Sequence, residues 1–154
     1  MQCFVLGERE KMISILQAAR YLVYLSNKKN NSILTPLKLQ KLLYLAQGWS
    51  YVWDDKPLFD EDFEAWQYGP VNTEVYYCFC KYGRGVIPMH EGKADINDLD
   101  ARETLDAIWR DYAAYSAFEL VELTHSQDPW KNAGYWHQVI HTEDIKRYFQ
   151  TTYS

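Results

Sequence analysis

Residues 35–53 read Thr-Pro-Leu-Lys-Leu-Gln-Lys-Leu-Leu-Tyr-Leu-Ala-Gln-Gly-Trp-Ser-Tyr-Val-Trp, and they predict a central helix. Thr35 can cap this helix, and Pro36 suits its first position, where a missing N–H costs nothing. Apolar residues follow on more than one side, which is typical of a helix that contacts several neighbours. Gly48 costs about 1 kcal/mol relative to alanine inside a helix, so we expect it to let another backbone come close.

The segments on either side of this helix also show helical periodicity. Apolar spacing and cap signals predict further helices over residues 12–25, 72–82, 101–115 and 116–123, a short one after Asp128 and a last one after Thr142. Residues 63–67 favour a short strand, Tyr68-Gly69-Pro70 is a turn signal, and residues 84–98 are expected to form a small hairpin or a loop. The sequence therefore predicts a mainly α fold, a compact single domain of about six helices with a minor β element, a short strand or hairpin.

The length and the pattern indicate one domain. A chain of 154 residues is of typical domain size, and it shows neither an internal repeat nor a linker. We expect residues 1–11 to be an N-terminal extension and residues 12–154 to be the domain. Met12 stands directly before the first periodic segment, so the alternative that translation starts there stays open.

The composition limits the classes of function. A net charge of −5 argues against binding to nucleic acids or anionic membranes. Three cysteines do not make a secreted disulfide framework, and no apolar run approaches the roughly 18–20 residues of a membrane helix. We therefore expect a cytoplasmic protein. Its 6 Trp, 13 Tyr and 6 Phe are a surplus of side chains that suit interfaces as well as cores.

Catalytic and metal-binding patterns are weak. His137 and His141 are spaced as two ligands on a helix face would be, but Cys78-x-Cys80 lacks the spacing of structural zinc sites. His125 could be a general base, yet the sequence has no nucleophile elbow and no phosphate-binding glycine loop. The interpretation is that the protein is not an enzyme and needs neither a cofactor nor a metal. A metal-dependent hydrolase remains a lesser alternative.

A binding signal remains in residues 63–71, Phe-Glu-Ala-Trp-Gln-Tyr-Gly-Pro-Val. Core packing is the simplest interpretation of Trp66. Tyr68 and the Gly69-Pro70 turn are less easily placed in a core, because turns lie at the surface. A rigid exposed turn that carries aromatic side chains can anchor another protein.

Two blocks resemble a known family, namely residues 34–48, Leu-Thr-Pro-Leu-Lys-Leu-Gln-Lys-Leu-Leu-Tyr-Leu-Ala-Gln-Gly, and residues 63–71. They are similar to the SocA-like antitoxin, or Panacea domain, family, which includes phage-associated GepA-type proteins. The resemblance extends from about Met12 to the 130s. It implies a predominantly helical fold and an antitoxin of a bacterial or prophage toxin–antitoxin pair that binds its toxin directly.

The resemblance leaves a second mechanism open, in which the domain is an adaptor that delivers the toxin to an ATP-dependent protease. In either case we expect the partner to be a cognate toxin, encoded by an adjacent gene. The candidate partner-binding residues come from the two blocks and the helix that follows them, and they are Lys38, Lys41, Tyr44, Trp66, Tyr68, Gly69, Pro70 and Tyr76.

Overall fold

The computed structural model describes residues 12–29, 33–134 and 136–154. The expected N-terminal extension, residues 1–11, lies outside the described residues. In the described part, no helix is long and apolar enough to cross a membrane.

Seven α-helices and one small antiparallel sheet make up the described part of the chain, which confirms the prediction of a mainly α fold of about six helices with a minor β element. Two short 3₁₀ turns, η1 (Cys80–Tyr82) and η2 (Met89–Glu91), complete it. The helices are α2 (Ile15–Lys29), α3 (Pro36–Asp54), α4 (Thr73–Phe79), α5 (Leu99–Tyr112), α6 (Ala117–His125), α7 (Asp128–Ala133) and α8 (Thr142–Tyr153), and the strands are β1 (Phe63–Trp66), β2 (Gly69–Val71) and β3 (Gln138–Ile140).

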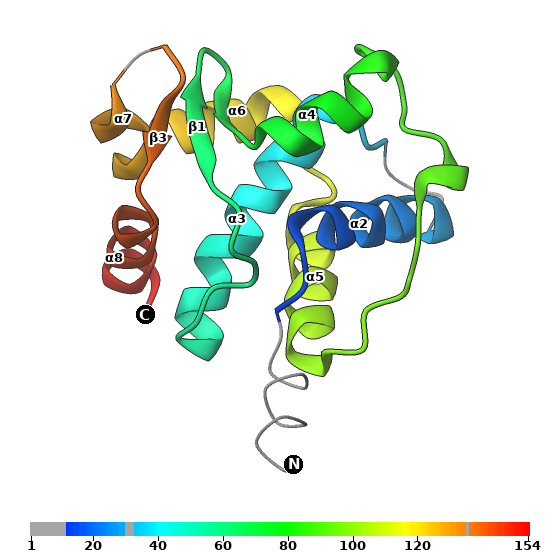
Figure 1. The fold of residues 1–154 in the computed structure, drawn as a ribbon, viewed down its shortest axis with the longest axis horizontal. Coiled ribbons are helices and arrows are strands. Elements are labelled where there is room, and N and C mark those ends of the chain that lie inside the picture. The colour runs from blue at the N-terminus through cyan, green and yellow to red at the C-terminus, as the bar shows by residue number, and fades with distance from the viewer. Residues whose placement is uncertain (1–11, 30–32, 135) are drawn as a thin grey trace, which may run out of the picture.

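Helix α3 is central, as predicted. Thr35 accepts a hydrogen bond from the backbone N–H of Lys38 and caps the helix, and Pro36 begins it. The helix is buried from Lys38 to Gly48 because its apolar side chains point in several directions. Helices α2 and α5 pack on one side of α3 and α8 on the other (Figure 1).

The sheet lies across one end of α3 (Figure 1), in the order β2-β1-β3. Its register pairs Glu64 with Val71 on one side of β1 and with Val139 on the other. Phe63 is buried on the opposite face, where its ring meets that of Tyr44 edge-on at 5.8 Å between centroids. The strand expected near residues 63–67 is therefore present, within a hairpin that positions the next turn above α3.

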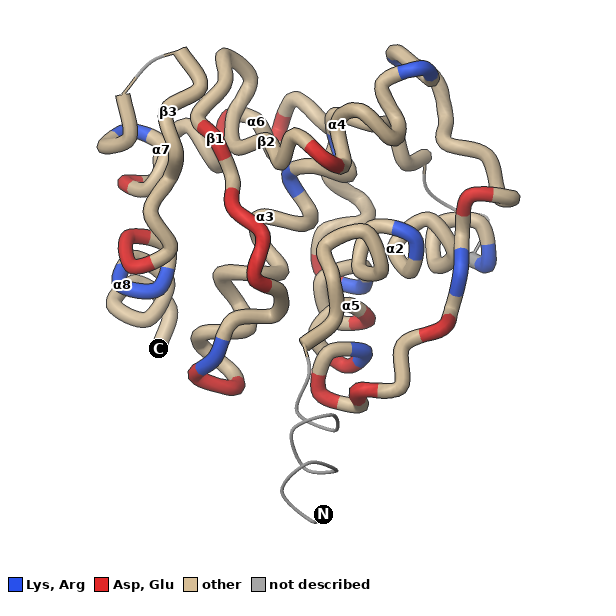
Figure 2. Tube along the Cα trace, in the orientation of Figure 1, with Lys and Arg blue, Asp and Glu red and all other residues tan. Residues whose placement is uncertain are grey.

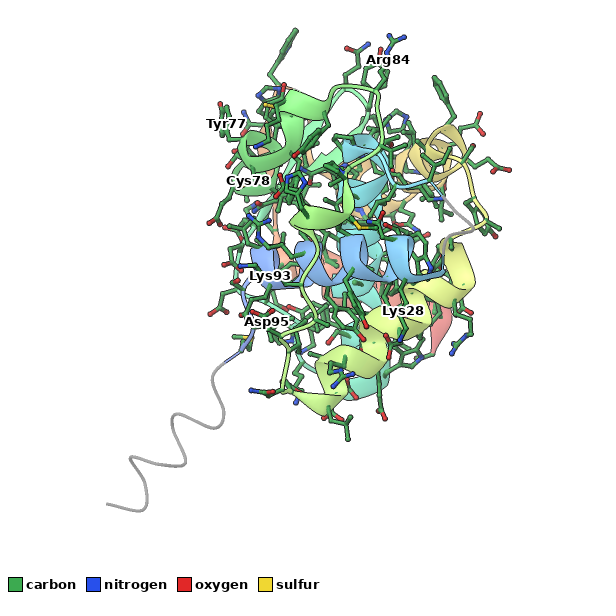
Figure 3. The ribbon with its side chains drawn as sticks, turned by 90° about the vertical axis from the view of Figure 1, so that its right-hand side faces the viewer. Lys28, Tyr77, Cys78, Arg84, Lys93 and Asp95 are labelled. Atoms are coloured by element: carbon green, nitrogen blue, oxygen red, sulfur yellow. The ribbon has the colours of Figure 1, made fainter. Side chains whose placement is uncertain are left out.

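The irregular stretch between α4 and α5 forms no hairpin. It crosses α2, as Figure 3 shows, with Lys93 and Asp95 on the crossing segment and Lys28 on the helix. The backbone N–H of Lys93 donates to the carbonyl of Arg20, whose guanidinium in turn reaches the Glu91 carboxylate at 2.8 Å. Pinned in this way, the segment covers α2.

Gly48 makes room for a ring rather than for a backbone. A Cβ placed on Gly48 would collide with the Phe149 side chain, which is fully buried. The expectation that another backbone comes close to Gly48 is therefore wrong. The helix that crosses here, α8, approaches through an aromatic side chain. This contact joins α8 to the middle of α3.

The Gly48–Phe149 contact predicts the effect of a methyl group. Gly48→Ala should lower the free energy of unfolding by about 1–3 kcal/mol, because overpacking outweighs the gain in helix propensity. Urea unfolding followed by circular dichroism measures this. In a Phe149→Leu background the same substitution should cost clearly less; an equal cost in both backgrounds would contradict the predicted collision.

Candidate functional site

The hairpin turn between β1 and β2 needs glycine at one position. Gly69 has a φ of 108°, on the left-handed side that other residues rarely adopt. A Cβ there would lie 2.7 Å from Cε of Lys41 and 2.9 Å from the Thr124 hydroxyl. The turn therefore sits tightly on α3 and α6.

Three side chains from three helices hold the turn through its backbone carbonyls. Nε1 of Trp130 donates to the carbonyl of Trp66 at 2.9 Å, and Nζ of Lys41 donates to that of Pro70 at 2.9 Å. Nε2 of His125 lies 2.8 Å from the carbonyl of Gln67. Because a carbonyl can only accept, this nitrogen carries a proton. The His125 ring also stacks on Trp130, with 4.0 Å between centroids.

The outer edge of β2 is covered by side chains of α3. Gln40 makes two hydrogen bonds to Asn72, accepting from its N–H at 2.9 Å and donating to its carbonyl at 3.0 Å. Pro70 has no N–H to offer, and Lys41 takes its carbonyl. Gln40 and Lys41 thus stand where a fourth strand would be, and an edge that could pair with another chain is closed.

Lys41 is fully buried. Its ammonium group meets the Pro70 carbonyl, and the described residues supply no ion pair to it. Burial in apolar surroundings disfavours the charged form and lowers the pKa of Lys41 to about 7. The amine therefore serves the turn as a buried hydrogen-bond donor.

A groove of about 840 Å³ opens beside the turn, and its lining is mostly apolar and aromatic. Its walls come from the hairpin, from α4, from the first turn of α3 and from the α7 region. Trp66 packs between Tyr76, at 4.9 Å between centroids, and His137, which stacks on it at 4.1 Å. The aromatic side chains that line the groove are Trp66, Tyr68, Tyr76, Phe79, Trp130, Trp136 and His137.

Three of the eight predicted contact residues lie at this groove. Tyr68 and Tyr76 are 51% and 39% exposed, and Trp66 is half-buried beside them. These three have surface that a partner could reach.

The other five predicted residues are buried: Lys38, Lys41, Tyr44, Gly69 and Pro70. They offer a partner no surface in this conformation. The three α3 side chains turn inward because the helix is central, and Gly69 and Pro70 lie in the turn that sits on α3 and α6. Lys38 donates to the Ala113 carbonyl and Tyr44 to the side chain of Gln127. In this conformation these side chains bind other parts of the same chain.

Two groove residues escaped the sequence analysis. Neither Trp130 nor Trp136 is among the predicted contact residues, and Trp136, 86% exposed, lies just after Gly134 in a stretch with no periodicity. The bulk and exposure of Trp136 become informative only once the fold places it at the groove.

The weaker catalytic candidates are dispersed. His137 stacks on Trp66, His125 holds the turn, and Cys80 is exposed at the groove wall. Over residues 12–29, 33–134 and 136–154, no three His, Cys, Asp or Glu side chains converge as metal ligands would.

The buried lysine predicts a pH dependence of stability. Its pKa is about 7 in the folded chain and 10.5 for a free side chain, so unfolding takes up a proton between these values. The free energy of unfolding should then rise with pH, by up to about 1.4 kcal/mol per pH unit. Because other groups also titrate, the quantity to measure is the difference between the wild type and Lys41→Met, by urea unfolding from pH 7 to 9.5.

The free energy of unfolding of the wild type minus that of Lys41→Met should rise across that range. Lys93→Met, at an exposed lysine, is the control and should leave the slope unchanged. A constant difference between wild type and Lys41→Met would show that Lys41 keeps its proton when buried.

Comparisons with known proteins match most of the part of the chain that forms this site. The model of the family described as antitoxin SocA-like, Panacea domain, matches residues 39–131, more than half of the chain. The antitoxin SocA of Caulobacter vibrioides is 37% identical over 106 residues, which cover 61% of this chain and 56% of the relative. The chain thus spans about half the length of that curated relative, and no solved structure matches it. The chain belongs to the SocA-like antitoxin, Panacea domain, family.

Proposed function

We propose that this protein is an antitoxin that neutralises a cognate toxin by binding it directly. Membership of the family and similarity to a protein named antitoxin SocA support the role. The observation that carries the mechanism is the aromatic groove, whose lining comes largely from the matched residues. The polar side chains of the same motif form hydrogen bonds that hold the turn beside the groove.

The turn is preorganised for binding. Side chains from α3, α6 and α7 fix three of its carbonyls, so little backbone freedom is left to lose when a partner docks. Tyr68 projects from this fixed turn, and Trp136 stands at the same groove. Large aromatic side chains on a rigid base are the usual anchors of protein interfaces.

The proposal predicts a loss of binding from one exposed ring. The protein is co-expressed with the product of the neighbouring open reading frame, and growth, co-purification and the Kd of the purified pair are measured. Wild type should restore growth and co-purify. Tyr68→Ala should raise the Kd by roughly thirtyfold or more, as expected of an interface hot spot, and weaken the rescue.

The matched control is Tyr115→Ala, which removes an exposed tyrosine from the connection between α5 and α6 and should change neither rescue nor Kd. Failure of the wild type to rescue growth or to co-purify would contradict the proposal. The proteolytic adaptor makes a different prediction. If the purified toxin stays active in the complex while its half-life in cells falls with this protein present, delivery to a protease is the mechanism.

A further inference from the structure

Three carboxylates lie near the β1 end of the groove. Asp62 and Glu74 are exposed and Glu64 is half-buried, and none of the three has an ion-pair partner in the part of the chain that the structure describes. We call these three carboxylates the acidic rim. Figure 2 shows acidic residues following one another along the approach to β1, with no basic residue among them.

Glu64 joins the acidic rim to the groove by direct contact. The Glu64 carboxylate accepts a hydrogen bond from Nε1 of Trp66 at 2.9 Å, and Glu64 pairs across the sheet with Val71. Both Trp66 and Val71 line the groove. Glu74 comes directly before two further lining residues, Val75 and Tyr76. A chain that fills the groove therefore passes the rim.

The other end of the groove has a different charge. Gly83 lines it there, and the exposed Arg84 follows, projecting outward in Figure 3. The groove thus runs from a carboxylate-bearing end near β1 to a basic residue beyond α4. Charges of opposite sign at these two places favour one orientation of an occupant of matching charge.

We propose that the groove receives a segment of the partner protein that buries a bulky apolar side chain among the rings and places lysine or arginine against the acidic rim. The inference rests on the proposed function only in naming the toxin as the source of that segment. The apolar lining supplies affinity, and the carboxylates supply selectivity and faster association.

Charge favours this occupant over the others. A second copy of the chain would bring another net charge of −5 toward the carboxylates. Nucleic acid is repelled by the same groups. A basic segment removes the mutual repulsion of the rim carboxylates, and its apolar anchor covers rings that otherwise face water.

The test does not need the toxin. A phage-displayed library of random dodecapeptides is selected on the immobilised full chain, and the Kd of each selected peptide is measured by fluorescence anisotropy at low and high salt. We expect selected peptides to carry Trp, Phe or Leu beside Lys or Arg. Their affinity should fall as salt screens the rim.

Two sets of matched variants assign the contacts. Asp62→Asn, Glu64→Gln and Glu74→Gln together should raise the peptide Kd about tenfold at low salt and much less at high salt. Asp95→Asn, Glu103→Gln and Glu143→Gln remove the same charge from exposed sites on other elements and should leave the Kd unchanged. Tyr68→Ala should weaken binding at both salt concentrations.

Three results would overturn the inference: no enriched peptide, enriched peptides without basic residues, or an equal effect of the two charge-neutralising sets. A concentration-dependent dimer that Tyr68→Ala dissociates would also overturn it, by assigning the groove to a second copy. The proposed function is judged separately by growth rescue. Rescue without basic peptides rejects only this inference, whereas basic peptides without rescue reject only the antitoxin role.

Discussion

The hydrogen bond from the buried Lys41 amine to the Pro70 carbonyl ties the two parts of the family motif together. The lysine comes from the second turn of the central helix and the carbonyl from the hairpin that follows it. Burial of an amine is costly unless the amine donates a hydrogen bond, and in this fold the Pro70 carbonyl accepts that bond. Gly69 is required for the same reason, because a larger residue would push the lysine stem away. The position of the groove depends on this contact, since the hairpin forms one of its walls.

In this site, one set of side chains holds the turn and another set is available for contact with a partner. Polar side chains beneath the turn fix its backbone, while the rings around it stay partly exposed. Such a division suits a binding protein, because the surface can be rigid without being occupied. It also explains why the motif combines lysine, glutamine and glycine, which look like surface residues, with the long apolar run of α3. Gln40 and Lys41 belong to the interior of this fold.

The sequence predicted the helices well because cap residues and apolar periodicity are local signals. Thr35-Pro36 and Ser116 both act as expected, the latter in a capping box with Glu119. Strand β3 was missed because three residues carry no usable periodicity, and it exists only by pairing with β1. The candidate contacts were predicted less well. A lysine in a sequence is normally expected to be exposed, and only the packing of α3 against the hairpin shows that Lys41 is buried.

The closed edge of β2 has an evolutionary consequence. Since its outward N–H and C=O groups are absent or already bonded, an incoming chain cannot be recognised there by a main-chain ladder that any extended sequence could satisfy. Under the proposed function, discrimination between toxins falls to side-chain shape and charge around the rings. Such positions can change without disturbing the folded framework, so new partner specificities are open to a lineage through a few surface replacements.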